Sequence, residues 1–216
     1  ITDSVTRGPF AESFRSIGTF ILLSSSPEPP RTILITSAEG SVGKTTTSIN
    51  TAVAMSRSFS KGIIIDADLR RPKVHHSLGL DNTIGLSSLL AGDVDFNDLY
   101  TKVVKPSSVK GLSVITSGPV PHNPTALLLS PIMRNLLMNL YPLYEFIIID
   151  SPPVIGISDA AYLSTIVDGT VLVVRSGETH GEALSEVRNI FNRLNSKIIG
   201  VVLNGARPNE LRYGDY

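Results

Sequence analysis

Short apolar runs alternate along the chain with segments whose apolar residues recur at helical spacing. Residues 62–68 are apolar on both faces, which is typical of a parallel strand covered by helices. Such runs predict strands over residues 31–37, 62–68, 111–117, 145–150, 169–175 and 197–203. The other segments predict helices over residues 10–23, 43–58, 83–100 (one or two short helices), 125–141 (with a break at Pro131), 158–167 (capped by Ser158) and 181–195.

Strands that alternate with helices predict an α/β fold, a doubly wound, mostly parallel sheet with helices on both faces in three layers. We expect residues 1–30 to form an N-terminal helix and linker packed on the core. Residues 31–204 form the main domain, and residues 205–216 read as a polar tail. Ligands of such sheets bind beyond the carboxyl ends of the strands, so functional side chains are expected there.

The stretch from Ile33 to Thr47 combines a buried strand, a loop of small residues and a Gly-Lys-Thr sequence that opens a helix. This order is typical of a phosphate-binding loop, whose backbone N–H groups and helix N-terminus surround an anion. Lys44 can reach the outer phosphates, and the Thr45 hydroxyl can bind Mg²⁺. Ala38 stands where the strict motif has its first glycine, and an ordinary turn before a helix is the competing interpretation. The predicted nucleotide contacts are Gly40, Ser41, Val42, Gly43, Lys44, Thr45 and Thr46.

Acidic residues end two of the predicted strands. Asp150 closes one strand, where a carboxylate beside the phosphate loop can hold Mg²⁺ through water. Asp66 and Asp68 close another, and their spacing puts both on the same side of an extended chain. One of these two can support the metal while the other accepts a proton from an attacking hydroxyl, and the sequence leaves these roles open. The alternative is that these residues are ordinary turn carboxylates. The presence of two such strand ends after one phosphate loop argues against this alternative.

Composition narrows the choice of function. The chain has 216 residues with zero formal net charge, so nothing indicates bulk attraction to nucleic acid or to an anionic membrane. The absence of cysteine excludes disulfides and cysteine-ligated zinc or iron–sulfur sites within this chain. No apolar run reaches the roughly 18–20 residues of a transmembrane helix.

Two groups of charged or titratable residues follow the second strand. Arg70, Arg71 and Lys73 are expected either to touch phosphate or a neighbouring subunit, or to form a solvated basic turn. His75 and His76 lack a spaced cluster of metal ligands, so we interpret them as surface or loop histidines.

Several segments resemble the bacterial tyrosine kinases, whose catalytic domain is built on a P-loop ATPase fold. Residues 64–73 resemble the Walker A′ motif of this family, residues 146–154 its Walker B motif and residues 38–46 its Walker A motif. Residues 12–17 resemble the start of its N-terminal helix, and residues 200–204 extend the likeness over nearly the whole chain. The Asp-x-Asp-x-Arg sequence followed by proline is the most specific part.

The resemblance implies a kinase that transfers phosphate from ATP, with Mg²⁺, to protein tyrosines. The implied catalytic residues are Lys44, Asp66, Asp68 and Asp150, and the implied metal contacts are Thr45, Asp66 and Asp150. Asn204 resembles a residue that lies against the adenine in related ATPases. The implied phosphoacceptors are Tyr213 and Tyr216 in the tail, modified between subunits of a ring.

The resemblance also implies a cellular setting. Kinases of this family regulate the synthesis and export of capsule or other exopolysaccharide. Their catalytic domain lies in the cytoplasm at the inner face of the membrane, where it works with a polysaccharide co-polymerase or adaptor that is fused or separate.

The chain departs from the family pattern at the ring interface and in the tail. Glu12 and Arg15 fit the interface pattern Glu-x-x-Arg-x-x-Arg, but Gly18 replaces its last arginine. We therefore expect a weakened ring and monomers at moderate concentration. Only Tyr213 and Tyr216 represent the expected tyrosine cluster.

The main alternative is a partitioning or cell-division ATPase on the same fold, without kinase activity. Such switches normally carry a second lysine early in the phosphate loop, and Ala38 and Glu39 occupy that region here. A third reading, an iron–sulfur carrier ATPase, is disfavoured by the lack of cysteine.

Overall fold

The computed structural model describes residues 8–24 and 28–206. The predicted acceptors Tyr213 and Tyr216, and most of the predicted tail, lie outside this described part. None of the helices in this described part is long and apolar enough to cross a membrane.

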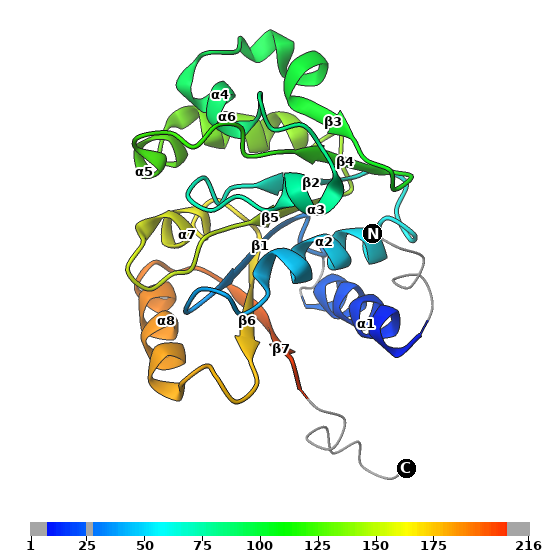
Figure 1. Ribbon diagram of the computed structural model, residues 1–216. Helices are drawn as coiled ribbons and strands as arrows, with labels where there is room; N and C mark the ends of the chain where they lie inside the picture. The colour runs from blue at the N-terminus through cyan, green and yellow to red at the C-terminus, as the bar shows by residue number, and fades with distance from the viewer. Residues whose placement is uncertain (1–7, 25–27, 207–216) are drawn as a thin grey trace.

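The described chain forms one seven-stranded sheet in the order β3-β4-β2-β5-β1-β6-β7 (Figure 1). All neighbouring strands are parallel except β3, which pairs antiparallel with β4 at the edge. The strands are β1 Thr32–Ser37, β2 Gly62–Asp66, β3 Val104–Pro106, β4 Leu112–Ile115, β5 Phe146–Asp150, β6 Gly169–Arg175 and β7 Ile198–Asn204. The predicted α/β class with a mostly parallel, doubly wound sheet is therefore confirmed.

Helices cover both faces of this sheet. They are α1 Pro9–Leu23, α2 Lys44–Met55, α3 Val74–Leu78, α4 Leu86–Ala91, α5 Pro124–Leu128, α6 Pro131–Leu140, α7 Ser158–Leu163 and α8 Gly181–Arg193. Within the range predicted as one or two short helices, α4 is followed by two short helical turns, Phe96–Asp98 and Leu99–Val103. The predicted break at Pro131 is confirmed, because this proline begins α6 after α5 has ended.

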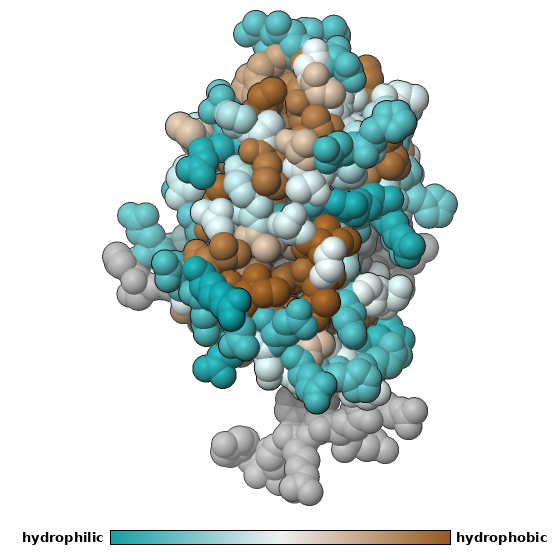
Figure 2. Space-filling view, turned by 90° about the vertical axis from the view of Figure 1, so that its left-hand side faces the viewer, coloured by the Kyte–Doolittle hydropathy of each residue, from teal (hydrophilic) through white to brown (hydrophobic). Residues whose placement is uncertain are grey.

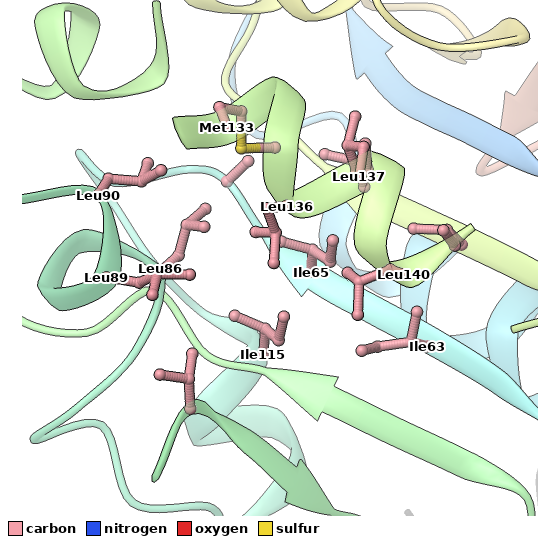
Figure 3. Packing of buried hydrophobic residues seen from close by; sticks show 14 of the residues in the cluster. Ile63, Ile65, Leu86, Leu89, Leu90, Ile115, Met133, Leu136, Leu137 and Leu140 are labelled. Carbon is pink, nitrogen blue, oxygen red and sulfur yellow. The ribbon is translucent and has the colours of Figure 1, made fainter. Parts of the chain in front are cut away.

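Alternate side chains of the central strands divide the core into two layers. Ile63 and Ile65 of β2 belong to one cluster, whereas Ile64 between them belongs to the cluster on the opposite face. Figure 3 shows the first of these, where Leu136 and Leu140 of α6 lie over β2. Burial on both faces explains why these strands read as continuous apolar runs rather than alternating ones.

The structure corrects one local prediction and adds two elements that were not predicted. The antiparallel strand β3 was not predicted, because its three residues include Pro106 and a lysine and give no apolar run. Ser158 does not cap α7: the cap position is Ile157, and no side chain provides a capping hydrogen bond there. The helix α3 was not predicted either, because the polar, basic residues 69–80 show no apolar periodicity.

Helix α1 packs on α2, and Gly18 lies in that contact. A Cβ atom built at Gly18 would meet Cγ of Met55 at 3.1 Å, so this position faces the core rather than solvent. Glu12 and Arg15 are exposed and form an ion pair with each other at 3.3 Å. Exposed pairs of this kind contribute little to stability. Their predicted role in a ring interface stays a prediction.

Candidate functional site

The loop between β1 and α2 has the backbone geometry that a phosphate-binding loop requires. Gly43, which precedes α2, is left-handed with φ 95°, and Ser41 also has a positive φ of 64°. Asn204, the last residue of β7, donates from Nδ2 to the carbonyl oxygen of Val42 at 2.8 Å. The end of β7 therefore supports the loop directly, and Asn204, predicted to lie near the adenine, contacts the loop.

Ala38 can replace glycine because its methyl group lies in a core cluster. It is fully buried among residues of β6, α8 and the segment after β5. Its carbonyl oxygen accepts a hydrogen bond from Ile155 N at 3.2 Å. The side chain at position 38 thus contributes to packing instead of obstructing the loop.

The loop geometry makes the substitution Gly43→Ala a sensitive test. A Cβ atom at this left-handed position would lie 2.2 Å from Nδ2 of Asn204, so the loop or β7 must move. We expect Gly43→Ala to weaken Mg·ADP binding by about tenfold or more, because the strain of roughly 1–2 kcal/mol falls on the binding loop. Titration calorimetry measures this effect.

Gly200→Ala is the matched control for this substitution. It lies on β7, the strand that ends at Asn204, but a Cβ there would meet nothing within 4 Å. Unchanged nucleotide affinity in Gly43→Ala, or an equal loss in Gly200→Ala, would contradict the role of loop geometry.

Sheet register brings the predicted acidic residues together. Because β2 pairs with β5, Asp66 lies directly opposite Asp150 at the carboxyl ends of these strands, while β1 on the other side of β5 leads into the phosphate loop. These ends point toward one side of the molecule in Figure 1. Figure 2 looks onto that side and shows apolar and polar residues intermixed across it.

Asp66 and Asp68 have different surroundings. Asp66 is fully buried, and its carboxylate accepts hydrogen bonds from three backbone N–H groups, those of Asp68 at 3.3 Å, Lys73 at 3.2 Å and Val74 at 3.0 Å. Asp68 is half-buried, and its Oδ1 accepts from the N–H groups of Arg70 and Arg71. Asp66 thus organises the loop that follows β2, while Asp68 projects from that loop.

Asp150 has one satisfied oxygen and one that lacks a partner. Ser48 Oγ of α2 donates to Oδ1 at 2.8 Å, whereas the buried Oδ2 has no hydrogen-bond partner among the described residues. Burial raises the pKa of Asp150 to about 6, against the opposing influence of the Thr45 and Ser48 hydroxyls and of the Lys44 ammonium. A buried carboxylate oxygen without a partner is costly unless a ligand satisfies it.

Burial and neighbouring charges together shift the pKa values of Asp66 and Lys44. Burial raises the pKa of Asp66 strongly, and the nearby charge of Asp150 raises it further. Burial lowers the pKa of Lys44, while Asp150 and then Asp68 counteract this shift. Lys44, Asp68 and Asp150 therefore lie close enough to interact electrostatically.

These residues fit a Mg²⁺ ion that is delivered with a nucleotide. The partnerless Oδ2 of Asp150 supplies an oxygen acceptor, and Thr45 in the first turn of α2 places its hydroxyl beside this carboxylate. Among the described residues no group of three or more His, Cys, Asp or Glu forms an all-protein metal site. Mg²⁺ usually keeps several waters and binds through one or two carboxylates and substrate phosphates.

The structure gives Arg70 a partner that the sequence did not indicate. Its guanidinium pairs with the buried carboxylate of Asp159 on α7, so the basic segment is neither fully solvated nor wholly free for phosphate. Asp159 gave no signal in the sequence, because an aspartate in the first turn of a helix is common. Both histidines lie on α3 rather than in a loop, and His76 is exposed as predicted, whereas His75 is half-buried.

Lys105 is a second unpredicted feature near the carboxyl end of β4. Its Nζ donates to the carbonyl oxygens of Asp81 and Ile84 and to Oγ1 of Thr116. Burial lowers its pKa, with Asp81 acting in the opposite direction. This lysine of β3 fixes the segment before α4 against the sheet.

Comparisons with known proteins agree with this geometry. A model of the ParA family, described as NUBPL iron-transfer P-loop NTPase, matches residues 29–208. The tyrosine-protein kinase YwqD of Bacillus subtilis is 37% identical over 207 residues, which cover 95% of this chain and 86% of the relative. The kinase domain of the Escherichia coli tyrosine kinase ETK superposes with a TM-score of 0.89 at 31% identity, covering 100% of this chain and 84% of that one.

A more distant likeness concerns the alternative function. The septum site-determining protein MinD from Pyrococcus horikoshii, solved with Mg-ADP, superposes with a TM-score of 0.67 at 24% identity, covering 82% of this chain and 72% of that one. At this identity the likeness shows the fold alone.

The match to the P-loop NTPase family makes this chain a nucleotide-binding protein. The tyrosine-protein kinases are more similar to this chain, over nearly all of both chains, and they identify the group within this family to which it belongs. This chain belongs to the bacterial tyrosine kinases, built on the ParA-type P-loop NTPase fold.

Proposed function

We propose that this chain transfers the γ-phosphoryl group of ATP, bound with Mg²⁺, to tyrosine hydroxyls, including Tyr213 and Tyr216 of its own tail. The observation that carries the proposal is the convergence of Lys44, Asp68 and Asp150 at one end of the sheet, with one oxygen of Asp150 lacking a partner. Phosphoryl transfer depends on positioning and on charge stabilisation, and this arrangement supplies both.

Lys44 and the loop hold the transferred phosphate. The ammonium of Lys44 neutralises charge on the outer phosphates, and the loop N–H groups before α2 surround them. Thr45 and Asp150 hold the Mg²⁺, which when bound neutralises the developing charge between the phosphates. The low exposure of Lys44 strengthens these interactions, because charges interact more strongly away from water.

Asp68 is the better candidate to accept the tyrosine proton. Both of its hydrogen bonds within the described chain end on Oδ1, which leaves Oδ2 for an incoming hydroxyl. Asp66 is fully buried and holds three backbone N–H groups, so it acts on the loop. The tyrosine oxygen attacks the γ-phosphorus, the bond to the β,γ-bridging oxygen breaks, and the tyrosine proton passes to Asp68 while ADP leaves.

The polysaccharide role follows from the family. We propose that phosphorylation by this chain regulates capsule or exopolysaccharide synthesis from the cytoplasmic face of the membrane, through a co-polymerase or adaptor. The iron transfer in the family-model description does not extend to this chain, which has no cysteine to hold an iron–sulfur cluster.

The acceptor assignment predicts where phosphate appears after incubation with Mg·ATP. Tandem mass spectrometry should locate it on Tyr213, Tyr216 or both, and the double substitution of these residues by phenylalanine should remove most of the anti-phosphotyrosine signal. Tyr100→Phe is the control, because Tyr100 is an exposed tyrosine that lies outside the tail, just before β3. An undiminished signal in the double variant would show that the acceptors lie elsewhere.

A further inference from the structure

We infer that Asp159 is a positioning residue that holds Arg70 and, through it, the catalytic loop, here meaning residues 67–73. This inference rests on the proposed function, because it assigns Asp159 a role through Asp68. The side chain of Asp159 is 1% exposed, whereas that of Arg70 is 37% exposed. A buried carboxylate at the start of α7 thus meets a partly exposed guanidinium from a loop that follows β2.

The contact is a closed set of three side chains. Arg70 Nε donates to Asp159 Oδ2 at 2.9 Å, and Arg70 Nη2 lies 3.4 Å from Oδ1. Arg70 Nη2 also donates to Thr125 Oγ1 of α5 at 2.7 Å, and that hydroxyl donates to Asp159 Oδ1 at 2.6 Å. A bidentate ion pair of this kind fixes the orientation of the two side chains as well as the distance between them.

The other end of the catalytic loop is fixed by Asp66. Its carboxylate accepts the backbone N–H groups of Lys73 and Val74, where the loop enters α3. Asp68 precedes both anchored positions in the chain, and its Oδ1 accepts the backbone N–H of Arg70 itself at 3.3 Å. A displacement of Arg70 therefore displaces the carboxylate of Asp68.

In this arrangement nucleotide binding and phosphoryl transfer depend on different contacts. The phosphate-binding loop is supported from β7 by Asn204, independently of the contact between Arg70 and Asp159. Loss of Asp159 should therefore leave nucleotide binding unchanged and slow the transfer step. Misplacement of a reacting group by about 1 Å can cost about 10²-fold in rate.

The test compares wild type, Asp159→Ala, Asp68→Asn and the double variant. We expect Asp159→Ala to lower kcat for phosphotyrosine formation by about 10- to 100-fold with an unchanged KM for ATP and an unchanged Kd for Mg·ADP. In the Asp68→Asn background, Asp159→Ala should cause little further loss, because a residue that acts through another does not add to its effect. Asp98→Ala, which breaks the exposed pair with Lys102, is the control.

Two further variants cover the case in which the alanine variant folds poorly. Asp159→Asn fills the same space, and Arg70→Lys keeps the charge but loses the bidentate contact. Each should show the same fall in kcat with unchanged Mg·ADP affinity. Full kcat in these variants, or full additivity with Asp68→Asn, overturns the inference while the kinase assignment stands. Wild-type protein that makes no phosphotyrosine overturns the proposed function itself.

Discussion

Substitution of Lys44 by methionine is expected to lower the rate of phosphotyrosine formation by about 10²- to 10³-fold, the usual cost of removing a pre-positioned charge from a transition state. Lys44 is buried, and its charge interacts with Asp150 and Asp68. Methionine has a similar length and packs readily, so the change removes the charge with little loss of volume. Quantitative anti-phosphotyrosine detection against time measures the rate.

Lys102→Met is the matched control for this prediction. It makes the same replacement at an exposed lysine whose partner is Asp98, outside the site. The control should transfer phosphate at the wild-type rate. A Lys44→Met variant that retained more than about a tenth of the wild-type rate would remove Lys44 from the transfer chemistry.

Substitution of Asp150 by asparagine is expected to change how stability depends on pH. Folding raises the pKa of Asp150 from the ordinary 3.8 to about 6, so the folded nucleotide-free protein binds this proton more tightly than the unfolded chain does. The resulting stabilisation is complete below about pH 4 and is lost as pH rises through about 6, a change of about 3 kcal/mol in the free energy of unfolding. Asp66, whose pKa is raised in the same direction, adds to this trend.

Urea unfolding of the two proteins over this pH range, without Mg²⁺ or nucleotide, measures the difference. Asp150→Asn should be the more stable protein at neutral pH and the two should converge toward about pH 4. Mg·ADP should reverse the order, because the ion satisfies the wild-type carboxylate and not the amide. A constant difference across the range would show that folding does not raise the pKa of Asp150.

Much of the fold could be predicted because the central strands are buried on both faces. Ile63, Ile64 and Ile65 leave no ambiguity between a strand and a loop, and the order of strands and helices then favours a parallel sheet. The edge strand β3 escaped prediction because Lys105 and Pro106 break its apolar pattern. Its pairing with β4 depends on contacts distant in sequence, which no local pattern reveals.

The candidate site, like the fold, could be predicted from the sequence only in part. Lys44, Asp66, Asp68 and Asp150 could be predicted to converge, because motif spacing places each at the end of a strand or the start of a helix. The different roles of Asp66 and Asp68 depend on which backbone N–H groups point at each carboxylate, and this is a property of the folded loop. Asp159 was missed for the same reason, since its partner Arg70 lies 89 positions away.

The central claim is that the γ-phosphoryl group passes to tyrosine rather than to water. The most direct measurement follows labelled γ-phosphate from Mg·ATP in the wild-type protein with its natural C-terminus, and compares the amount on tyrosine with the amount released. We expect phosphotyrosine that accumulates with time and is absent in Lys44→Met. Steady release of inorganic phosphate without any phosphotyrosine would contradict it and would favour a switch ATPase on the same fold.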